Sequence, residues 1–139
     1  MIVLDTNVLS ELMRSAPGAS VLNWVATQSA ANLFVTTITQ AEILHGVLLL
    51  PRGRRRASIE AAADAMFEED FAGRLLPFNS LAAYAYAEIA VARRQSGRPI
   101  SQFDAQIAAI AKSAGADVAT RNVPDFEGCG IKVIDPWQS

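Results

Sequence analysis

The chain is poor in thiol and imidazole groups, with one cysteine, Cys129, and one histidine, His45, among 139 residues. A single cysteine excludes an internal disulfide. No stretch of about 18 uncharged apolar residues occurs, so we expect no membrane span. Asp5 interrupts the apolar run at the start, and no basic segment precedes that run, which does not fit a secretory signal. We therefore expect a cytoplasmic protein.

The chain also lacks a large excess of charge of either sign. Its net charge is -2, which gives no overall attraction to nucleic acid, so a polyanion would have to be held locally. One basic cluster is present, formed by Arg52, Arg54, Arg55 and Arg56. The planar guanidinium group suits phosphate, and the cluster is a candidate RNA-binding surface. It is equally explained as the solvated start of a helix in an arginine-rich chain.

What the sequence has in quantity is core-forming material, 51% hydrophobic residues, which predicts one compact domain over residues 1–139. Runs rich in β-formers alternate with runs of helical periodicity. The predicted strands are 2–4, 32–39, 74–78, 116–120 and 130–135, and the predicted helices are 6–14, 19–28, 40–50, 54–73, 80–97 and 102–115. Strands separated by helices of this length predict parallel βαβ units, and hence a three-layer α/β/α sandwich with a central parallel sheet.

Four acidic residues lie at the junctions that follow or precede these elements. Asp5 follows the first strand, and Asp125 lies in the loop after the strand that ends at Thr120. Glu42 and Asp104 fall in the first turns of two predicted helices. In an open parallel sheet these junctions lie at one edge, where such folds form binding crevices. We therefore expect four carboxylates from separate segments to converge.

Three of the four acids, Glu42, Asp104 and Asp125, also have a simpler interpretation when taken alone. Thr39-x-x-Glu42 and Ser101-x-x-Asp104 match capping boxes, and Asp125 is explained as a loop residue. The shared edge favours a site instead, because crowded like charges repel one another unless a cation or raised pKa values relieve them. A cation is the simpler explanation.

The available donors indicate which cation would bind. We expect His45 to pack in the core and Cys129 to be a small buried filler, which leaves only carboxylates. An all-oxygen site suits Mg²⁺, or Mn²⁺, and argues against structural zinc. Hard cations held by a few acids, with positions left for water and phosphate, are typical of metal-assisted phosphodiester hydrolysis, in which the metal activates a water.

Four segments of the chain resemble the successive motifs of the PIN domain, in matching order and spacing and over nearly the whole length. They are "LDTNVLSEL", "TTITQAEILHGV", "ISQFDAQIAAIAKSAG" and "VATRNVPDFEGCGIKVIDPW". More narrowly, they are similar to the VapC and FitB ribonuclease toxins of toxin–antitoxin pairs. This resemblance implies a Mg²⁺-dependent endoribonuclease acting on structured RNA such as tRNA or rRNA. It also implies a cognate VapB/FitA-like antitoxin, homodimers and toxin–antitoxin hetero-oligomers.

The resemblance also assigns roles to individual residues. Asp5 and Asp104 match the principal metal ligands of the family, and Glu42 matches its third acid. Thr6 and Thr120 match hydroxyl residues that line the site. We expect these three acids, and Asp125 with them, to take part in catalysis.

The last motif departs from the family pattern at one position. Many PIN domains have a fourth acid where this chain has Asn122, which can accept a hydrogen bond but carries no charge. Asp125, three residues further on, is a candidate for the missing carboxylate. The departure leaves open whether one or two metal ions bind.

Other acidic-pocket proteins fit the sequence less well. A receiver domain would have paired acids after the first strand, and an aspartyl phosphatase would have a second acid where Asn7 stands. Both also need a catalytic lysine, and Lys112 and Lys132 are the only lysines. The remaining alternative is a PIN-like regulatory protein that binds RNA or a partner without cleaving, against which the intact set of three acids argues.

Overall fold

Five short parallel strands form the centre of the molecule in the computed structural model, which describes residues 1–138. They are β1 (Ile2–Leu4), β2 (Leu33–Thr36), β3 (Leu75–Leu76), β4 (Asp117–Ala119) and β5 (Val133–Ile134). Their order across the sheet is β3-β2-β1-β4-β5, with Val3 of β1 in register with Phe34 and Val118. The first strand in the chain is therefore the central strand of the sheet.

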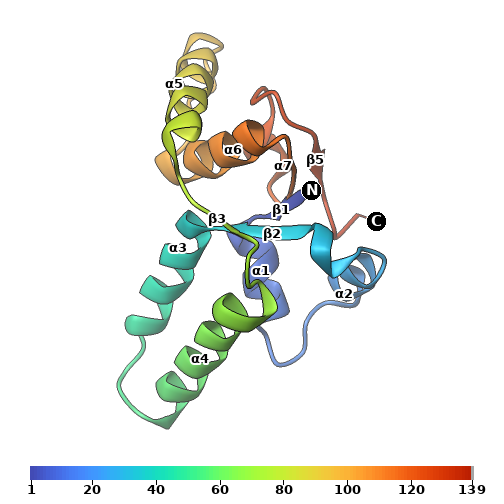
Figure 1. Ribbon diagram of the computed structural model, residues 1–139, viewed down its shortest axis with the longest axis vertical. Coiled ribbons are helices and arrows are strands. Elements are labelled where there is room, and N and C mark those ends of the chain that lie inside the picture. The colour runs from blue at the N-terminus through green and yellow to red at the C-terminus, as the bar shows by residue number, and fades with distance from the viewer. Residues whose placement is uncertain (139) are drawn as a thin grey trace.

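Helices cover both faces of this sheet, so the predicted three-layer sandwich is confirmed (Figure 1). One side has α1 (Thr6–Leu12), α2 (Ala19–Ala26), α3 (Thr37–Leu48), α4 (Arg54–Ala65) and a π-helical turn, η2 (Met66–Asp70). A short 3₁₀ turn, η1 (Ala30–Asn32), precedes β2. The other side has α5 (Ser80–Gln95), α6 (Gln102–Ala114) and α7 (Val123–Phe126). The α3 and α4 helices project together as a hairpin below the sheet (Figure 1).

Two hydrophobic cores fill the space between the layers. Leu4 packs in the core with α1 and α4, whereas its neighbour Val3 packs in the core with α5 and α6. Because β1 is buried on both faces, its sequence is a continuous apolar run, as expected for a central parallel strand. Asp5 comes directly after this run, at the carboxyl end of the central strand.

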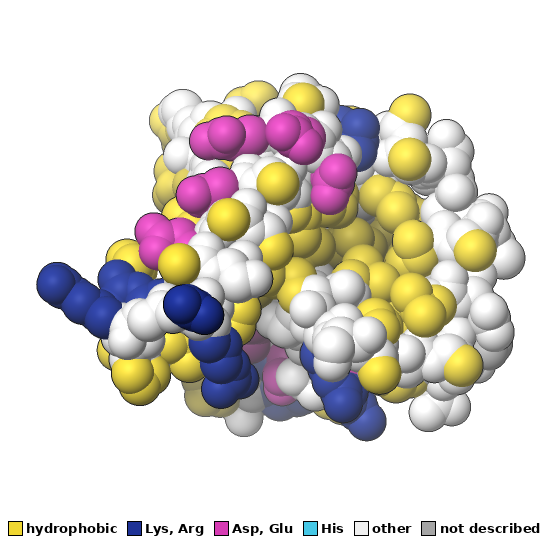
Figure 2. Space-filling model, turned by 90° about the horizontal axis from the view of Figure 1, so that it is seen from below, with side chains coloured by type: hydrophobic (Ala, Val, Ile, Leu, Met, Phe, Trp, Pro, Cys, Tyr) yellow, Lys and Arg dark blue, Asp and Glu magenta, His cyan; other side chains and the backbone are white. Residues whose placement is uncertain are grey.

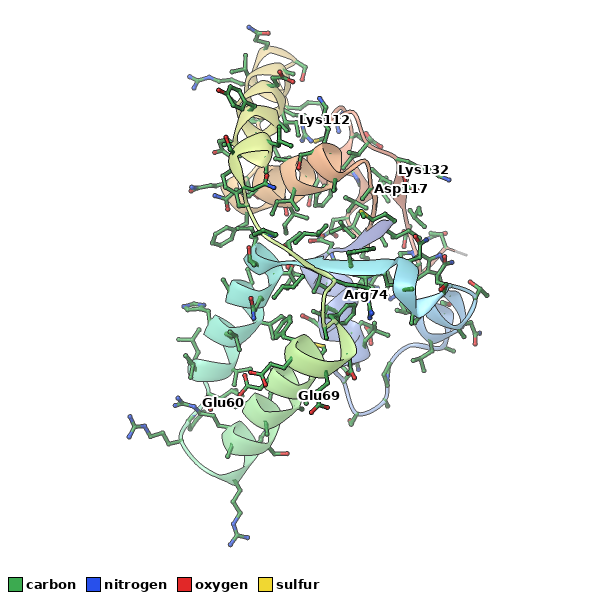
Figure 3. The ribbon with its side chains drawn as sticks, in the orientation of Figure 1. Glu60, Glu69, Arg74, Lys112, Asp117 and Lys132 are labelled. Carbon is green, nitrogen blue, oxygen red and sulfur yellow. The ribbon has the colours of Figure 1, made fainter. Side chains whose placement is uncertain are left out.

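Arg74 connects the end of the α4 hairpin to the sheet (Figure 3). Its Nε donates to the carbonyl oxygen of Leu33 at 2.9 Å, and its guanidinium group also donates to the Asp70 carbonyl. The same group lies over the Phe71 ring, 5.4 Å from the centroid. These contacts hold the chain as it leaves η2 and enters the edge strand β3.

Several element boundaries differ from those predicted, and two of these differences involve segments that carry candidate site residues. The strand predicted over 32–39 ends at Thr36, because the Thr36 hydroxyl accepts from the Thr39 N–H at 3.1 Å and so caps α3. That cap overrides the strand propensity of the residues that follow. The segment after β4, predicted as a loop, contains the short helix α7, with Pro124 in its first turn.

Within residues 1–138, no helix has both the length and the apolar character required to cross a membrane. The longest helix, α5 (Ser80–Gln95), carries Glu88, Arg93 and Arg94.

Candidate active site

A cleft of about 540 Å³ opens at the carboxyl edge of the sheet, where β1 leads into α1 and the N-terminal parts of α3 and α6 approach. Three of the predicted acids line it, each from a different helix or helix cap. The lining residues are Asp5, Thr6, Asn7, Ser10, Glu11, Arg14, Glu42, Asp104 and Asn122. We call this feature the acid cleft.

Asp5 is the most buried of the three acids and is the N-cap residue of α1. One carboxylate oxygen accepts from the Thr6 N–H at 2.8 Å. The other accepts from the Thr120 hydroxyl at 2.8 Å and from the Asn7 amide at 3.3 Å. Burial nevertheless outweighs the donors from Thr120 and Thr6, which lower the pKa of Asp5, and with a smaller contribution from the charges of Asp104 and Glu42 it raises this pKa from 3.8 to about 6.

Glu42 lies in the second turn of α3 rather than the first, so the capping-box interpretation of Thr39 and Glu42 is wrong. Its carboxylate accepts from the Thr6 hydroxyl at 2.9 Å. Since that hydroxyl has only one proton, Thr39, 2.9 Å from the same oxygen, must donate to it. Burial raises the pKa of Glu42, and the charge of Asp104 adds to the increase.

Asp104 lies in the first turn of α6, whose N-cap is Ser101 as predicted. The Ser101 hydroxyl accepts from the Asp104 N–H at 3.2 Å. The Asp104 side chain is half-buried in the cleft, and burial raises its pKa. The negative charge of Asp125 also raises this pKa, whereas the positive charge of Arg93 lowers it.

The fourth acid does not join the other three. Asp125 lies on α7, is exposed, and is absent from the cleft lining, whereas Asn122 lines the cleft. The buried Arg93 of α5 fixes this segment by donating to the carbonyl oxygens of Asp125 and Glu127 at 2.8 and 2.9 Å. The expected convergence therefore holds for three carboxylates. Asp125 acts on the cleft only through its charge.

Sequence reasoning missed several residues of the cleft wall that come from α1 and the turn after it. Asn7 donates to Asp5 and to the Thr120 hydroxyl, and its own oxygen accepts from the Arg121 N–H at 3.1 Å. Ser10, Glu11 and Arg14 follow at spacings of three and four residues and share the cleft wall. Polar residues at these spacings lie on one face of a helix, beside its apolar face, so the sequence could have predicted that this polar face of α1 lines the cleft.

Two residues assigned from the sequence can now be placed. His45 is exposed on α3, so the predicted packing role in the core is wrong. Its position follows from the start of α3 at Thr37, which turns Ile43 and Val47 toward the core instead. Cys129 is buried and packs in the core with α5 and α6, as predicted.

Comparison with known proteins agrees with this geometry. Residues 2–125 match the PIN domain family. The chain belongs to that family.

Relatives include the plasmid stability protein StbB of Pseudomonas syringae pv. tomato, 42% identical over 100% of both chains, and the VapC ribonuclease Y4jK of Sinorhizobium fredii, 39% identical over 99% of both. The toxin FitB of Neisseria gonorrhoeae is 36% identical over 99% of both. The crystal structure of FitAcB from that organism matches with a TM-score of 0.94 at 35% identity, covering both chains fully. The resemblance found in the four motifs is confirmed.

The acid cleft of this PIN domain has the donor chemistry of a hard-cation site. No thiol or imidazole lines it, and three of its acids, Asp5, Glu42 and Asp104, are partly or fully buried with raised pKa values. Among residues 1–138, no three Asp, Glu, His or Cys side chains form a group that could by itself hold a metal ion. Mg²⁺ does not require one, because it keeps several waters and binds through one or two carboxylates. The residues present therefore fit Mg²⁺.

The four arginines predicted to bind RNA lie outside the acid cleft. Arg52, Arg54, Arg55 and Arg56 surround the turn between α3 and α4, and we call them the arginine tip. Figure 2 shows basic side chains at this end of the hairpin and a row of acidic side chains further along α4. The tip follows the end of α3, and the segment from Glu42 to Leu48 spans about 9 Å of helix, so the tip can contact only parts of a bound molecule that are remote from the acids.

Proposed function

We propose that this PIN domain is a Mg²⁺-dependent endoribonuclease, the toxin of a toxin–antitoxin pair, which cleaves structured RNA such as tRNA or rRNA. The observation that carries the proposal is the acid cleft. Three carboxylates with raised pKa values share it and have no soft donors beside them. Relatives named as a VapC ribonuclease and a toxin support the same activity.

We assign Asp5, Asp104 and Glu42 as the residues that hold the metal and position the attacking water. The chemistry that a bound Mg²⁺ would supply is activation of that water and neutralisation of charge at the phosphodiester. Thr120 and Thr6 orient the acids, since each hydroxyl donates to one carboxylate, Asp5 and Glu42 respectively. Each acid thus keeps lone pairs available on the cleft side.

We assign the fourth position of the site to Asn122 rather than Asp125. Asn122 lines the cleft, and its backbone N–H donates to the Thr120 hydroxyl at 3.1 Å. With a neutral amide there, one tightly bound metal ion suits the cleft better than two. Asp125 supports the site by increasing the negative potential at Asp104.

Incubating purified protein with total tRNA and with ribosomal RNA, in Mg²⁺ and in EDTA, tests the proposed activity. We expect discrete cleavage products in Mg²⁺, none in EDTA, and none from Asp5→Asn, which keeps the side-chain shape. Folded wild-type protein that cleaves neither RNA with Mg²⁺ or Mn²⁺ would favour the alternative, a PIN-like regulator that binds RNA or a partner without cutting. Cleavage by Asp5→Asn at the wild-type rate would exclude the assigned site.

We further propose an antitoxin partner of the VapB/FitA kind, whose tail fills an apolar groove beside the acid cleft. The groove, about 350 Å³, is lined by α1, α3 and Ile59 of α4, and it shares Thr6, Ser10 and Glu42 with the acid cleft. Ala63 and Met66, which follow Ile59 along the chain, are buried in the core and do not line this groove. A tail in the groove would thus lead directly to the acids.

A basic antitoxin side chain, most simply an arginine, can then replace the metal at these carboxylates. Titrating Mg²⁺ into the free toxin and into the toxin–antitoxin complex tests this. We expect weaker Mg²⁺ binding by the complex. Equal affinities would mean that the antitoxin blocks RNA access without entering the acid cleft.

Homodimer formation remains part of the proposal. Large exposed apolar side chains gather on α5 and the start of α6, including Leu81, Tyr84 and Phe103. Sedimentation of the wild type and of Tyr84→Glu would test whether a second copy covers this face. We expect a dimer for the wild type and a monomer for the variant.

A further inference from the structure

Arg14 is the only basic residue among those that line the acid cleft in residues 1–138. It lies two residues beyond the end of α1, and 64% of its side chain is exposed. A helix rises about 1.5 Å per residue, so the α1 segment sets the Arg14 backbone roughly 12 Å beyond Asp5. The cleft therefore has Asp5, Glu42 and Asp104 at one end, and Glu11 with a single guanidinium group at the other.

A buried acid holds this guanidinium group in place. Arg14 Nη1 donates to both carboxylate oxygens of Glu11, at 3.2 and 2.9 Å. Glu11 is only 8% exposed, and one of its oxygens also accepts from the Gly18 N–H at 3.2 Å. Glu11 is thus held by the backbone that leads into α2, and its carboxylate in turn holds the Arg14 guanidinium group by two hydrogen bonds.

The pairing uses only one of the three guanidinium nitrogens. Within the described part of the chain, Nε and Nη2 of Arg14 have no hydrogen-bond partner, and the side chain is largely exposed. Because Arg14 is largely exposed, the pair contributes at most about 1 kcal/mol to stability, so stability alone does not account for the placement of Arg14 at the cleft. The remaining N–H groups form a fork of the kind that binds phosphate oxygens.

We propose that Arg14 binds a backbone phosphate of the RNA strand, next to the phosphodiester that lies at the three acids. This inference rests on the proposed function, and it identifies a substrate-positioning residue. A phosphate at the acids would be neutralised by the metal, whereas its neighbour along the strand meets no metal and would be repelled by the uncompensated carboxylates. Arg14 supplies the missing positive charge, and Glu11 orients it without consuming the whole fork.

Three variants separate this role from a structural one. Arg14→Gln removes the charge but can still donate to Glu11, and Arg14→Lys keeps the charge but loses the planar fork. Arg94→Gln is the matched control, because Arg94 is exposed on α5 and does not line the cleft. The probe is a fluorescein-labelled single-stranded RNA of 12 nucleotides and mixed sequence. Binding is followed by anisotropy in Ca²⁺, in place of Mg²⁺, over a series of salt concentrations.

For Arg14→Gln we expect an increase in Kd of about tenfold and a salt slope smaller by about 0.7, the value for one phosphate of a single strand that is no longer neutralised. Arg14→Lys should keep the slope and recover part of the affinity, and Arg94→Gln should match the wild type. In Mg²⁺, Arg14→Gln should raise KM with kcat nearly unchanged, as expected for loss of uniform binding.

An unchanged Kd and slope in Arg14→Gln would overturn the inference, even if the wild type cleaves RNA. A wild type that does not bind the probe would also overturn it. Weakened binding by Arg14→Gln in a protein that cuts no RNA would instead uphold the phosphate contact and refute the nuclease activity. A fall in kcat alone, with KM unchanged, would place Arg14 in catalysis and contradict a positioning role.

Discussion

The acid cleft and the arginine tip both concentrate charge of one sign, but their side chains are held very differently. In the cleft, each acid is partly or fully buried, and Asp5 and Glu42 accept hydrogen bonds from Thr120 and Thr6. At the tip, the arginines are largely exposed and, within residues 1–138, form no hydrogen bond or ion pair with another side chain. The cleft holds its charged groups with hydrogen bonds, whereas the tip presents its charged groups to solvent.

The two regions also destabilise the fold to different extents. Burying like charges in the cleft is costly, as the raised pKa of Asp5 shows. Glu69 lies beyond the C-terminus of α4 (Figure 3). This acid and the arginines at the N-terminus of α4 both oppose the helix dipole, but that effect is screened and small. Buried charges that the fold keeps at such a cost indicate a function more strongly than exposed ones do.

Among the effects of mutating the two regions, we expect the largest difference in the rate of RNA cleavage. Glu42→Gln and Asp104→Asn keep the shape and most hydrogen bonds of the cleft but remove one charge each, so we expect at least about 100-fold slower cleavage with an unchanged fold. Arg55→Gln, an equally neutral change at the tip, should slow cleavage by less than about threefold. Single-turnover rates and circular dichroism of the three variants would check this. Similar losses in all three would remove the distinction between the regions.

Removing the charge of an acid in the cleft should increase the stability of the fold, although it decreases cleavage. The raised pKa means that native Asp5 binds more protons than unfolded Asp5 between pH 3.8 and about 6, so the fold loses stability as pH rises through that window. The loss approaches about 3 kcal/mol above pH 6. Asp5→Asn removes it, and the asparagine oxygen can still accept from the Thr6 N–H.

We therefore expect Asp5→Asn to be more stable than the wild type in EDTA at pH 7.5, and close to it at pH 4. Urea unfolding at the two pH values measures the difference. Mg²⁺ should stabilise the wild type far more than the variant. A variant that is less stable than the wild type at pH 7.5 would show that ionised Asp5 is held favourably without a metal.

The smallest expected effect concerns the arginine tip. Reversing all four charges of the tip to Glu should weaken RNA binding evenly across sequences. The salt slope should fall by roughly one unit for each phosphate that the tip no longer binds. Filter binding of tRNA at several salt concentrations would measure both quantities. An unaltered slope would leave the tip as a solvated helix start.

Much of the fold followed from the sequence because local patterns and tertiary structure agree. Ile2-Val3-Leu4 has no polar alternation, which identified a strand buried on both faces. Thr37 to Thr39 were assigned to a strand because β-branched residues dominate there. The Thr36 cap starts the helix earlier, and propensity alone could not reveal that side-chain contact.

The candidate site followed from topology more than from motif detail. Asp5, Glu42 and Asp104 could be brought together because carboxyl ends of parallel strands share one edge. The roles of Asn7 and Arg14 depend on which face of α1 meets the cleft, and that is decided by the packing of Val8 and Leu9 in the core. Asp125 was misplaced because Arg93, distant in sequence, holds its segment by backbone carbonyls.

Calorimetric titration of Mg²⁺ into the wild type and into Asp5→Asn, at pH 7.5 and pH 5.5, tests most directly whether the acid cleft is a metal site. For the wild type at pH 7.5 we expect about one ion per chain. Affinity should fall at pH 5.5, because protons compete for a carboxylate whose pKa is about 6. Asp5→Asn should bind at least about tenfold more weakly at pH 7.5 and show little dependence on pH. Equal Mg²⁺ affinity in the two proteins at pH 7.5 would contradict the assignment of the acid cleft as the metal centre of this nuclease.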